Sequence, residues 1–424
     1  MSFTVRNVLA GATLLGAVGG VLGGFAFLRR QSLLGDALAH ATLPGVCLAF
    51  LLTGSKAPLV LFTGALIAGL IGALAILGVV RGSRIKEDAA IGTVLSVFFG
   101  FGIVLLSRVQ RSPAGNQSGL DKFLFGQAAT LVESDVALMA LTGGLALGTV
   151  LLLYKEFKLV TFDRGFAASL GLPTIRLDVA LTLLLVMVVV IGLQTVGVVL
   201  VVATLVTPAA AARQWTDSLG RMLLLSGLLG AGAGAVGAWV SASAPRVPTG
   251  PVIVLAGAAA LLVSLFLAPR RGLLWSYWRE RRLAARIRRE NLLKDLYRYG
   301  ERLGGDFAAP VPLIHLRGVR GQGLGELRGA TARLARESLV ERIGDALRLT
   351  GGGVERAASV VRKHRLWELY LTRRLALPLD HVHRDAETME HALDDGAEAR
   401  LDEILGYPPT DPHGQPIPRP GGRA

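Results

Sequence analysis

The sequence predicts an all-α polytopic membrane protein of about nine transmembrane helices, followed by a charged, mainly α-helical cytoplasmic region. The chain has 424 residues and a mean hydropathy of +0.52, and up to Leu274 it is a series of long apolar runs. From Trp275 onward its composition is ordinary and charged. There are 19 Lys and Arg against 10 Asp and Glu before Trp275, and 26 against 21 after it. The basic excess of the first part lies in short loops, as in membrane proteins.

Each apolar run is about 17–25 residues long, which is the length that a helix needs to cross a hydrocarbon core of about 30 Å. The sixth and seventh runs nearly touch, so the boundary between them is the least defined. The nine predicted spans cover residues 7–28, 37–54, 57–80, 89–107, 129–154, 175–192, 194–212, 221–242 and 250–268.

Loop charge predicts the orientation. With the N-terminus outside, 13 Lys and Arg of the membrane part fall in cytoplasmic loops and 6 fall outside. Positive residues concentrate on the cytoplasmic side. We therefore expect a multi-pass protein of the cell (inner) membrane with its C-terminal domain in the cytoplasm.

Several classes of function are excluded. The only cysteine is Cys47, so neither a disulfide framework nor a cysteine-based zinc site is available. No G-x-x-x-x-G-K-[ST] phosphate loop occurs in the sequence. The chain therefore has no recognisable ATPase of its own, and we do not expect an enzyme.

The second apolar segment, GDALAHATLPGVCLAFLL, begins with a polar pair. Asp36 and His40 are four residues apart, so they share one face of a helix. Ionisable side chains persist in a membrane helix where they pair, line a wet path or hold an ion. Chemistry alone leaves two interpretations, a pair that fixes helix packing near an interface and a pair that lines a wet path or holds an ion.

The cytoplasmic loop FKLVTFDRGFAASLGLP, residues 157–173, has helical content of its own. Asp163 is placed to cap a short helix that ends at Gly171, before Pro173. Such a helix either contacts a soluble partner or rests on lipid headgroups. Membrane lipid is also expected around Trp275, Tyr277 and Trp278, which form an interfacial belt beside basic residues.

Five stretches together resemble the integral-membrane permeases of metal-ion ABC importers, which take up manganese, zinc or iron. They are GDALAHATLPGVCLAF, EDAAIGTVLSVFFGFGIVLLS, FDRGFAASLGLP, GLQTVGVVLVVATLVTPAAAAR and VPTGPVIVLAGAAALLVSLFLAPRRGLL. The resemblance covers residues 5–274 and implies a second permease copy or a sibling, two cytoplasmic ATPase subunits and an extracytoplasmic metal-binding protein. It places Asp36 and His40 on the metal translocation path. It places Phe162, Asp163, Phe166 and Gly171 in the loop that contacts the ATPase.

The first half of the tail has the element order of a winged helix. A helix is expected over 279–303, a poorly patterned stretch over 304–322, a basic helix over 323–338, and two short strands around Gly344-Asp345. The basic helix would be the recognition helix, and its candidate DNA contacts are Arg328, Arg333 and Arg336. A solvated basic face explains the same charges.

The second half of the tail carries histidines and glutamates at helical spacing. His364 and Glu368 lie four residues apart on a helix expected over 353–375. On a second helix, over 380–395, one face carries His383, Glu387, Glu390 and His391. Nitrogen and oxygen donors without sulfur suit manganese, iron or zinc.

The segment KHRLWELYLTRRLALPLDHVHRDAETMEHALDD, with TDPHGQPIP after it, resembles the metal-binding and dimerisation domain of repressors of the diphtheria-toxin-repressor type. The resemblance implies two ligand groups, the first His364, Glu368 and His383 and the second Glu387, Glu390 and His391. Iron-responsive members usually have cysteine where this chain has Glu387, so the resemblance favours Mn²⁺ over Fe²⁺ or Zn²⁺. The family supplies a further Asp or Met from its first helix, where this chain has Asn291 with Glu290 adjacent. Either the site is weaker, or Glu290 substitutes.

The sequence thus predicts three domains. They are a transmembrane metal permease (1–274), a linker helix with a winged-helix-like region (275–350), and a metal-binding and dimerisation domain of repressor type (351–424). The expected function is that of a permease subunit for divalent metal ions, with a cytoplasmic metal-sensing tail. One alternative is a membrane-tethered or released metal-dependent transcriptional repressor that binds DNA, and another is a tail that only dimerises.

Overall fold

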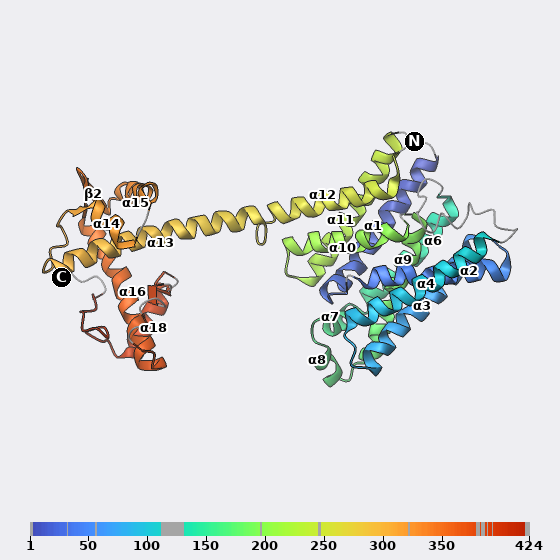
Figure 1. Ribbon diagram of the computed structural model, residues 1–424, viewed down its shortest axis with the longest axis horizontal. Helices are drawn as coiled ribbons and strands as arrows, with labels where there is room; N and C mark the ends of the chain where they lie inside the picture. Colours follow the sequence, from blue (N-terminus) through green and yellow to red (C-terminus); the bar gives the residue numbers. More distant parts are fainter. Residues whose placement is uncertain are drawn as a thin grey trace. The chain divides into compact units, whose positions relative to one another are not determined.

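A computed structural model describes residues 3–31, 33–55, 57–111, 131–195, 197–244, 247–320, 323–378, 382, 386–387, 389–391 and 393–419. The chain divides into two compact units, Met1–Ser276 and Tyr277–Ala424 (Figure 1). The further division of the tail at residue 350 stays a prediction.

The first unit is a bundle of helices, as predicted. Among the described residues, eight helices are long and apolar enough to cross a membrane. The predicted seventh span is also helical, as α10, and Gly197, with φ 81°, separates it from α9. The helices of this unit are α1 (Phe3–Leu28), α2 (Leu34–Thr53), α3 (Pro58–Gly82), α4 (Glu87–Gln110), α6 (Glu133–Leu152), α7 (Tyr154–Phe162), α8 (Arg164–Ser169), α9 (Thr174–Thr195), α10 (Val198–Trp215), α11 (Leu219–Ser243) and α12 (Thr249–Leu267).

Small residues set the closest helix contacts of the bundle. A Cβ atom added at Gly16 of α1 would overlap the backbone of Gly230 in α11. One turn further along α1, the hydroxyl of Ser226 donates a hydrogen bond to the carbonyl oxygen of Gly20 at 2.6 Å. Close backbone approach of this kind is typical of membrane helices, where packing drives association. These glycines therefore serve as packing surfaces between α1 and α11.

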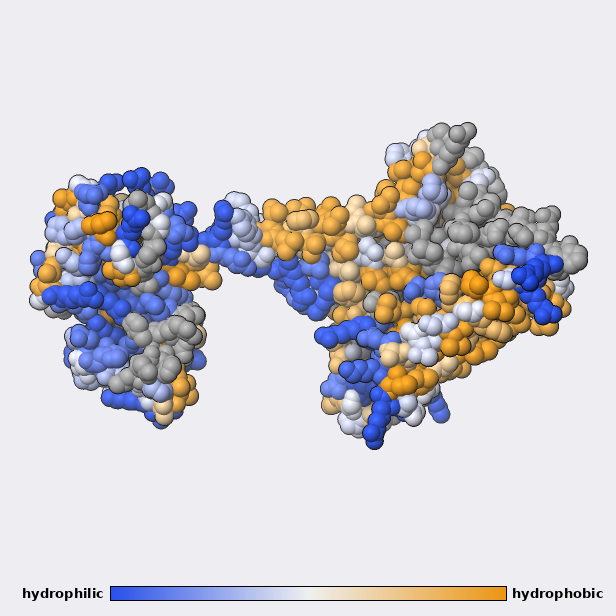
Figure 2. Space-filling view, in the orientation of Figure 1, coloured by the Kyte–Doolittle hydropathy of each residue, from blue (hydrophilic) through white to orange (hydrophobic). Residues whose placement is uncertain are grey.

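The outer surface of the first unit is apolar. Large exposed side chains project from α3, α4, α6, α11 and α12, and Figure 2 shows the hydrophobic colouring that they produce. An exposed apolar surface of this extent marks a membrane or protein interface rather than a water-facing one.

The second unit begins with a winged-helix arrangement. It comprises α13 (Leu273–Arg302), β1 (Val311–Pro312), α14 (Leu313–Arg320), α15 (Leu324–Arg336), β2 (Val340–Ile343) and β3 (Ala346–Leu349). The strands pair antiparallel in the order β1-β3-β2. Gly344, with φ 58°, makes the turn of the predicted hairpin. Helix α14 was not expected, because it is short and lies within a stretch that contains Gly304, Gly305, Pro310 and Pro312, although the helix itself is amphipathic.

The last part of the chain packs on α16 (Gly351–Leu375), which confirms the helix predicted over 353–375. Thr350 caps α16 by accepting a hydrogen bond from the Gly353 amide at 3.0 Å. A shorter helix, α18 (Asp395–Leu405), packs beside it, and Leu366, Leu369, Leu405 and Ile417 form a small core. Of the helix predicted over 380–395, residues 380–381, 383–385, 388 and 392 lie outside the described residues, and Val382, Ala386, Glu387 and Met389 are helical.

Candidate metal sites and coupling surface

The polar pair of the membrane unit forms as predicted. Nε2 of His40 lies 3.5 Å from Oδ1 of Asp36 on α2. The side chains are 37% exposed for Asp36 and 22% for His40 on the single chain. The His40 ring contacts Phe99 of α4 edge-on at 4.8 Å between centroids. The pair thus lies beside an aromatic ring at a surface of the bundle and is not enclosed within it.

The loop between α6 and α9 folds into two short helices, α7 and α8. A carboxylate oxygen of Asp163 accepts a hydrogen bond from the Phe166 amide at 2.8 Å, so Asp163 caps α8 as predicted. Gly171 ends this segment with φ 77°. The side chains of Phe162 and Phe166 are both more than half exposed. These two exposed phenyl rings, one at the end of α7 and one on the capped helix α8, are suited to contact another protein.

A buried carboxylate that the sequence analysis did not single out joins four helices near this loop. Asp178, in the first turns of α9, forms ion pairs with Arg29 after α1 at 3.1 Å, Arg81 of α3 at 3.0 Å, and Arg164 of α8 at 3.0 Å. Its side chain is only 8% exposed. One acidic residue inside an apolar run is the signal that would have indicated it, because such residues need partners.

In the tail, His364 and Glu368 pair as predicted. Nε2 of His364 lies 3.1 Å from the Glu368 carboxylate, one turn further along α16. Nδ1 of the same ring contacts the carboxylate of Glu390. Both ring nitrogens of His364 are therefore engaged by protein groups. The cluster is deeply buried, because His364, Glu368 and Glu390 are 0%, 2% and 3% exposed.

A lysine lies beside the contact of His364 with Glu390 and reaches both side chains. The Nζ atom of Lys294, on α13, is 3.1 Å from Nδ1 of His364 and 2.9 and 2.7 Å from the two oxygens of Glu390. Burial alone would raise the pKa of Glu390, but hydrogen bonds from His364 and the charge of Lys294 outweigh it and lower that pKa. The sequence analysis did not predict Lys294 at this position.

His391 is held differently. Its Nδ1 lies 2.6 Å from the carboxylate of Glu290. Burial opposes the charge on Glu290, but the hydrogen bonds and charges of His391 and Arg286 outweigh it and bring the pKa of Glu290 to about 2. Among the described residues, Nε2 of His391 is buried without a hydrogen-bond partner, and the nearest carboxylate oxygen, of Glu390, is 3.4 Å away.

These contacts decide how the cluster fits a divalent ion. A ring whose Nδ1 bonds a carboxylate and whose Nε2 is unpartnered is the usual arrangement of a metal-ligating histidine. His391 fits that arrangement, with Glu290 orienting the ring. His364 does not, because the Lys294 ammonium occupies the position beside it. No group of three or more acidic, histidine or cysteine side chains in the described part of the chain is arranged to hold an ion.

Two predicted ligands stay less defined. His383 lies outside the described residues. Glu387 is half-buried, and its negative charge acts on Lys294. The assignment of both to a metal site stays a prediction.

The basic helix α15 exposes the three predicted arginines, Arg328, Arg333 and Arg336. Arg328 also lines a cleft of about 270 Å³ with Arg317 of α14 and Arg342 of β2. Asp345 also lines this cleft and pairs with Arg342 at 3.9 Å, so Arg317 and Arg328 are the guanidinium groups that favour an anionic ligand such as a phosphate.

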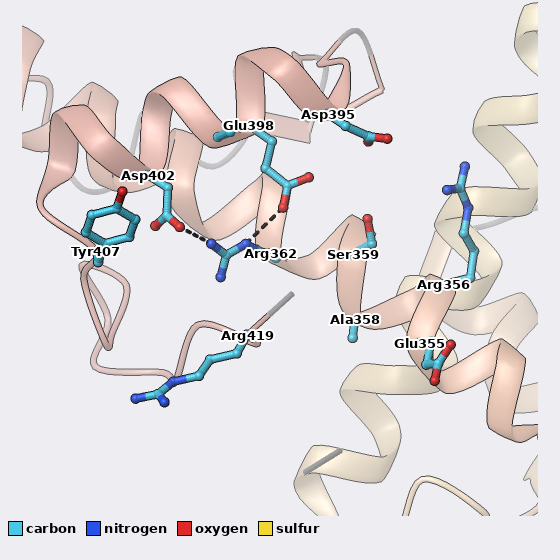
Figure 3. Close-up of a pocket in the computed structure, with 11 residues that line it drawn as sticks. Glu355, Arg356, Ala358, Ser359, Arg362, Asp395, Glu398, Asp402, Tyr407 and Arg419 are labelled. Atoms are coloured by element: carbon cyan, nitrogen blue, oxygen red, sulfur yellow. Dashed lines mark hydrogen bonds and ion pairs between the residues drawn. The ribbon is translucent and has the colours of Figure 1, made fainter. Parts of the chain in front are cut away.

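A second charged cluster of the tail has a structural role. Arg362 on α16 donates to Glu398 at 2.9 Å and to the carbonyl oxygen of Pro418 at 2.6 Å, and it pairs with Asp402 (Figure 3). The guanidinium is nearly buried. It therefore joins α16, α18 and the C-terminal segment beside an open pocket that Tyr407 and Arg419 also line.

Comparison with known proteins adds two family matches. Residues 1–268 match the ABC 3 transport family. Residues 350–419 match the iron-dependent repressor family, metal binding and dimerisation domain.

Named relatives cover most of the chain. The manganese transport system membrane protein MntC of Bacillus subtilis is 44% identical over 371 residues, which cover 87% of this chain and 84% of the relative. The zinc transport system membrane protein TroC of Treponema pallidum is 49% identical over 282 residues, covering 66% of this chain and 95% of the relative. Among solved structures, PsaBC from Streptococcus pneumoniae in complex with Fab matches with a TM-score of 0.57 and 35% identity, over 64% of this chain and 94% of that one.

Proposed function

Because the chain belongs to the ABC 3 transport family and ends in a domain of the iron-dependent repressor type, we propose that it carries Mn²⁺ into the cell and responds to the metal through its tail. The relatives are named for manganese and zinc transport. The carboxylate and imidazole of Asp36 and His40 suit manganese, iron or zinc alike. Manganese is favoured by the tail, where Glu387 supplies a carboxylate at the position that is usually cysteine in iron-responsive repressors, and zinc or iron are the alternatives.

One observation carries the transport proposal. Asp36 and His40 form a polar pair on a helix long enough to cross the membrane, and both side chains remain partly exposed on the single chain. An ionisable pair in a spanning helix is costly unless it faces a partner or a wet path. We assign the pair to the metal path, beside a second permease copy or a sibling.

Uptake of radioactive Mn²⁺ by cells that lack other manganese importers tests this assignment, with the ATPase and the metal-binding protein supplied. Asp36→Asn and His40→Ala are each expected to lower uptake at least tenfold at equal protein level. Leu48→Ala is the matched control, because Leu48 is an exposed, uncharged residue of the same helix. Uptake at the wild-type rate in both variants would exclude the pair from the path.

The energy for transport would come from separate cytoplasmic ATPase subunits. The exposed Phe162 and Phe166, on the segment that Asp163 caps, are the proposed contact for the ATPase. An extracytoplasmic metal-binding protein would deliver the ion on the other side. This arrangement requires the N-terminus outside and the tail in the cytoplasm, as the loop charges predict.

The tail would then report metal that has entered. We propose feedback in which bound metal orders the tail and restrains uptake. The buried, unpartnered Nε2 of His391 supports a metal ligand at this position. The variant with Glu387→Ala and His391→Ala together is expected to continue uptake at high internal manganese, where the wild type shuts off. Unchanged shut-off in that variant would contradict the feedback.

The second candidate function is metal-dependent DNA binding by the tail. It rests on the cleft lined by Arg317, Arg328 and Arg342. Fluorescence anisotropy of the detergent-solubilised chain with labelled DNA, over a series of salt concentrations, tests it. Phosphate contacts would make the affinity fall steeply with salt, and Arg328→Gln would reduce that slope. Binding that depends on neither salt nor Mn²⁺ would exclude this function.

A further inference from the structure

Lys294 is the feature of the tail cluster that the predicted ligand set leaves out. The residue is fully buried, and so is the carboxylate of Glu390 that faces it. A buried ammonium persists in a protein only with a paired charge and hydrogen bonds. Lys294 has both, because its Nζ atom reaches the two oxygens of Glu390 and Nδ1 of His364 within 3.1 Å.

These three atoms, the two carboxylate oxygens of Glu390 and Nδ1 of His364, are also of the types that bind a divalent metal ion. A metal ion binds imidazole nitrogen and carboxylate oxygen at about 2.0–2.2 Å. An ion bound by Glu390 and Nδ1 of His364 would therefore lie within the space that the ammonium occupies. The second nitrogen of His364 faces the carboxylate of Glu368 at 3.1 Å, so Nδ1 is the ring atom available to an ion shared with Glu390.

From this geometry we propose that Lys294 is a built-in cation that takes the place of a metal ion between His364 and Glu390, so that this half of the cluster is ordered without metal. The inference rests on the proposed role of the tail as the metal-responsive part. It places metal binding in the native tail on the His391 side of the cluster.

The two histidines illustrate the difference. His391 has the Glu290 carboxylate on Nδ1 and no partner on Nε2 among the described residues, so it retains a position for an ion. His364 has protein partners on both nitrogens. His391 thus keeps one ring nitrogen for a metal ion, whereas both ring nitrogens of His364 are engaged by other groups of the chain.

The experiment uses the full chain in detergent, freed of metal with a chelator and then equilibrated with Mn²⁺. Bound Mn²⁺ per chain is measured by elemental analysis, and hydrogen exchange of the 360–369 peptide is followed by mass spectrometry with and without the metal. The test variant is Lys294→Met, which keeps the apolar stem and removes the ammonium. Arg282→Met, which removes an exposed charge from the same helix, is the matched control.

We expect His364→Gln to leave bound Mn²⁺ unchanged in the otherwise wild-type chain, and Mn²⁺ to leave exchange in the 360–369 peptide unchanged. Lys294→Met should bind one additional Mn²⁺ per chain, and its exchange in that peptide should slow when Mn²⁺ is added. The additional ion should be lost again when His364→Gln is combined with Lys294→Met. Arg282→Met should behave as the wild type.

Two results would overturn the inference. The first is that His364→Gln, introduced into the wild-type chain, removes one bound Mn²⁺. This result would mean that the metal displaces Lys294, and it would leave the proposed metal sensing by the tail unaffected. The second is a folded Lys294→Met chain that gains no Mn²⁺. Should this variant fail to fold, the His364→Gln comparison alone decides. Metal sensing is tested separately, by whether His391→Gln lowers bound Mn²⁺ in the wild-type chain.

Discussion

Replacement of Asp178 by asparagine is expected to destabilise the membrane unit and to slow transport. The carboxylate pairs with three arginines at 3.0–3.1 Å, and the change would leave them without a counter-charge. Removing one partner of a buried ion pair costs about 3–5 kcal/mol. Arg29 is nearly buried, at 12% exposed, and bears most of this cost, whereas Arg164 is 52% exposed and its pair is worth less than about 1 kcal/mol. We therefore expect a loss of about 3 kcal/mol.

The assay combines two measurements on each variant, the unfolding temperature in detergent and the uptake of Mn²⁺ by cells. Asp178→Asn should lower the unfolding temperature by about 5–10 °C and also lower uptake. Arg164→Gln should leave the unfolding temperature nearly unchanged but lower uptake, because it disconnects α8 from α9. The control is Arg176→Gln, because Arg176 is an exposed arginine on α9, the helix that carries Asp178. Wild-type uptake with Arg164→Gln would refute the role of this ion pair in coupling.

Three further predictions concern packing and pH. Gly230→Val should abolish folded permease, because its Cβ would overlap the backbone of Gly16, whereas Gly232→Val, with open space around it, should express normally; equal expression would contradict the packing. Arg362→Met should lower the unfolding free energy of the tail by about 3–5 kcal/mol in urea titrations, since Asp402 loses this ion pair and Glu398 retains only Lys363 at 3.6 Å, and an unchanged midpoint would contradict this. Because the folded pKa of Glu290 lies below its ordinary value of 4.5, at about 2, its stabilisation of the tail is complete above pH 4.5 and is lost as the pH falls toward 2. Unfolding curves of Glu290→Gln should lack this part of the pH dependence, and an identical acid profile would exclude the ion pairs of Glu290 as its cause.

Local signals made part of this molecule predictable. The cap at Asp163, the end of the α8 segment at Gly171 and the hairpin turn at Gly344 depend on residues within a few positions of each other. The pairing of Asp36 with His40 and of His364 with Glu368 follows from helical spacing in the same way. These features were therefore correctly predictable from the sequence.

Contacts between distant segments were not predictable by the same means. Lys294 and Glu390 are 96 residues apart, and Arg81 and Asp178 are 97 apart. Nothing near Lys294 in the sequence distinguishes it from the basic residues around it on α13, which are mostly exposed. Only the packing of α13 against α16 brings the ammonium to His364, and helical spacing within one segment carries no information about that.

The close crossing of α1 and α11 also bears on how the permease changes conformation. Backbone lies against backbone at Gly16 and Gly230, and the Ser226 hydroxyl bonds the carbonyl oxygen of Gly20. No flexible side chain separates the two helices there, so the contact has nothing that can repack in small steps. The close contact continues one turn to either side, where a Cβ atom added at Gly20 would overlap the backbone of Ser226 and one added at Gly234 would overlap the backbone of Ala12. Because backbone meets backbone over several turns, we expect α1 and α11 to move as one rigid body during the transport cycle, and the movements that open the path to occur at other contacts of the bundle.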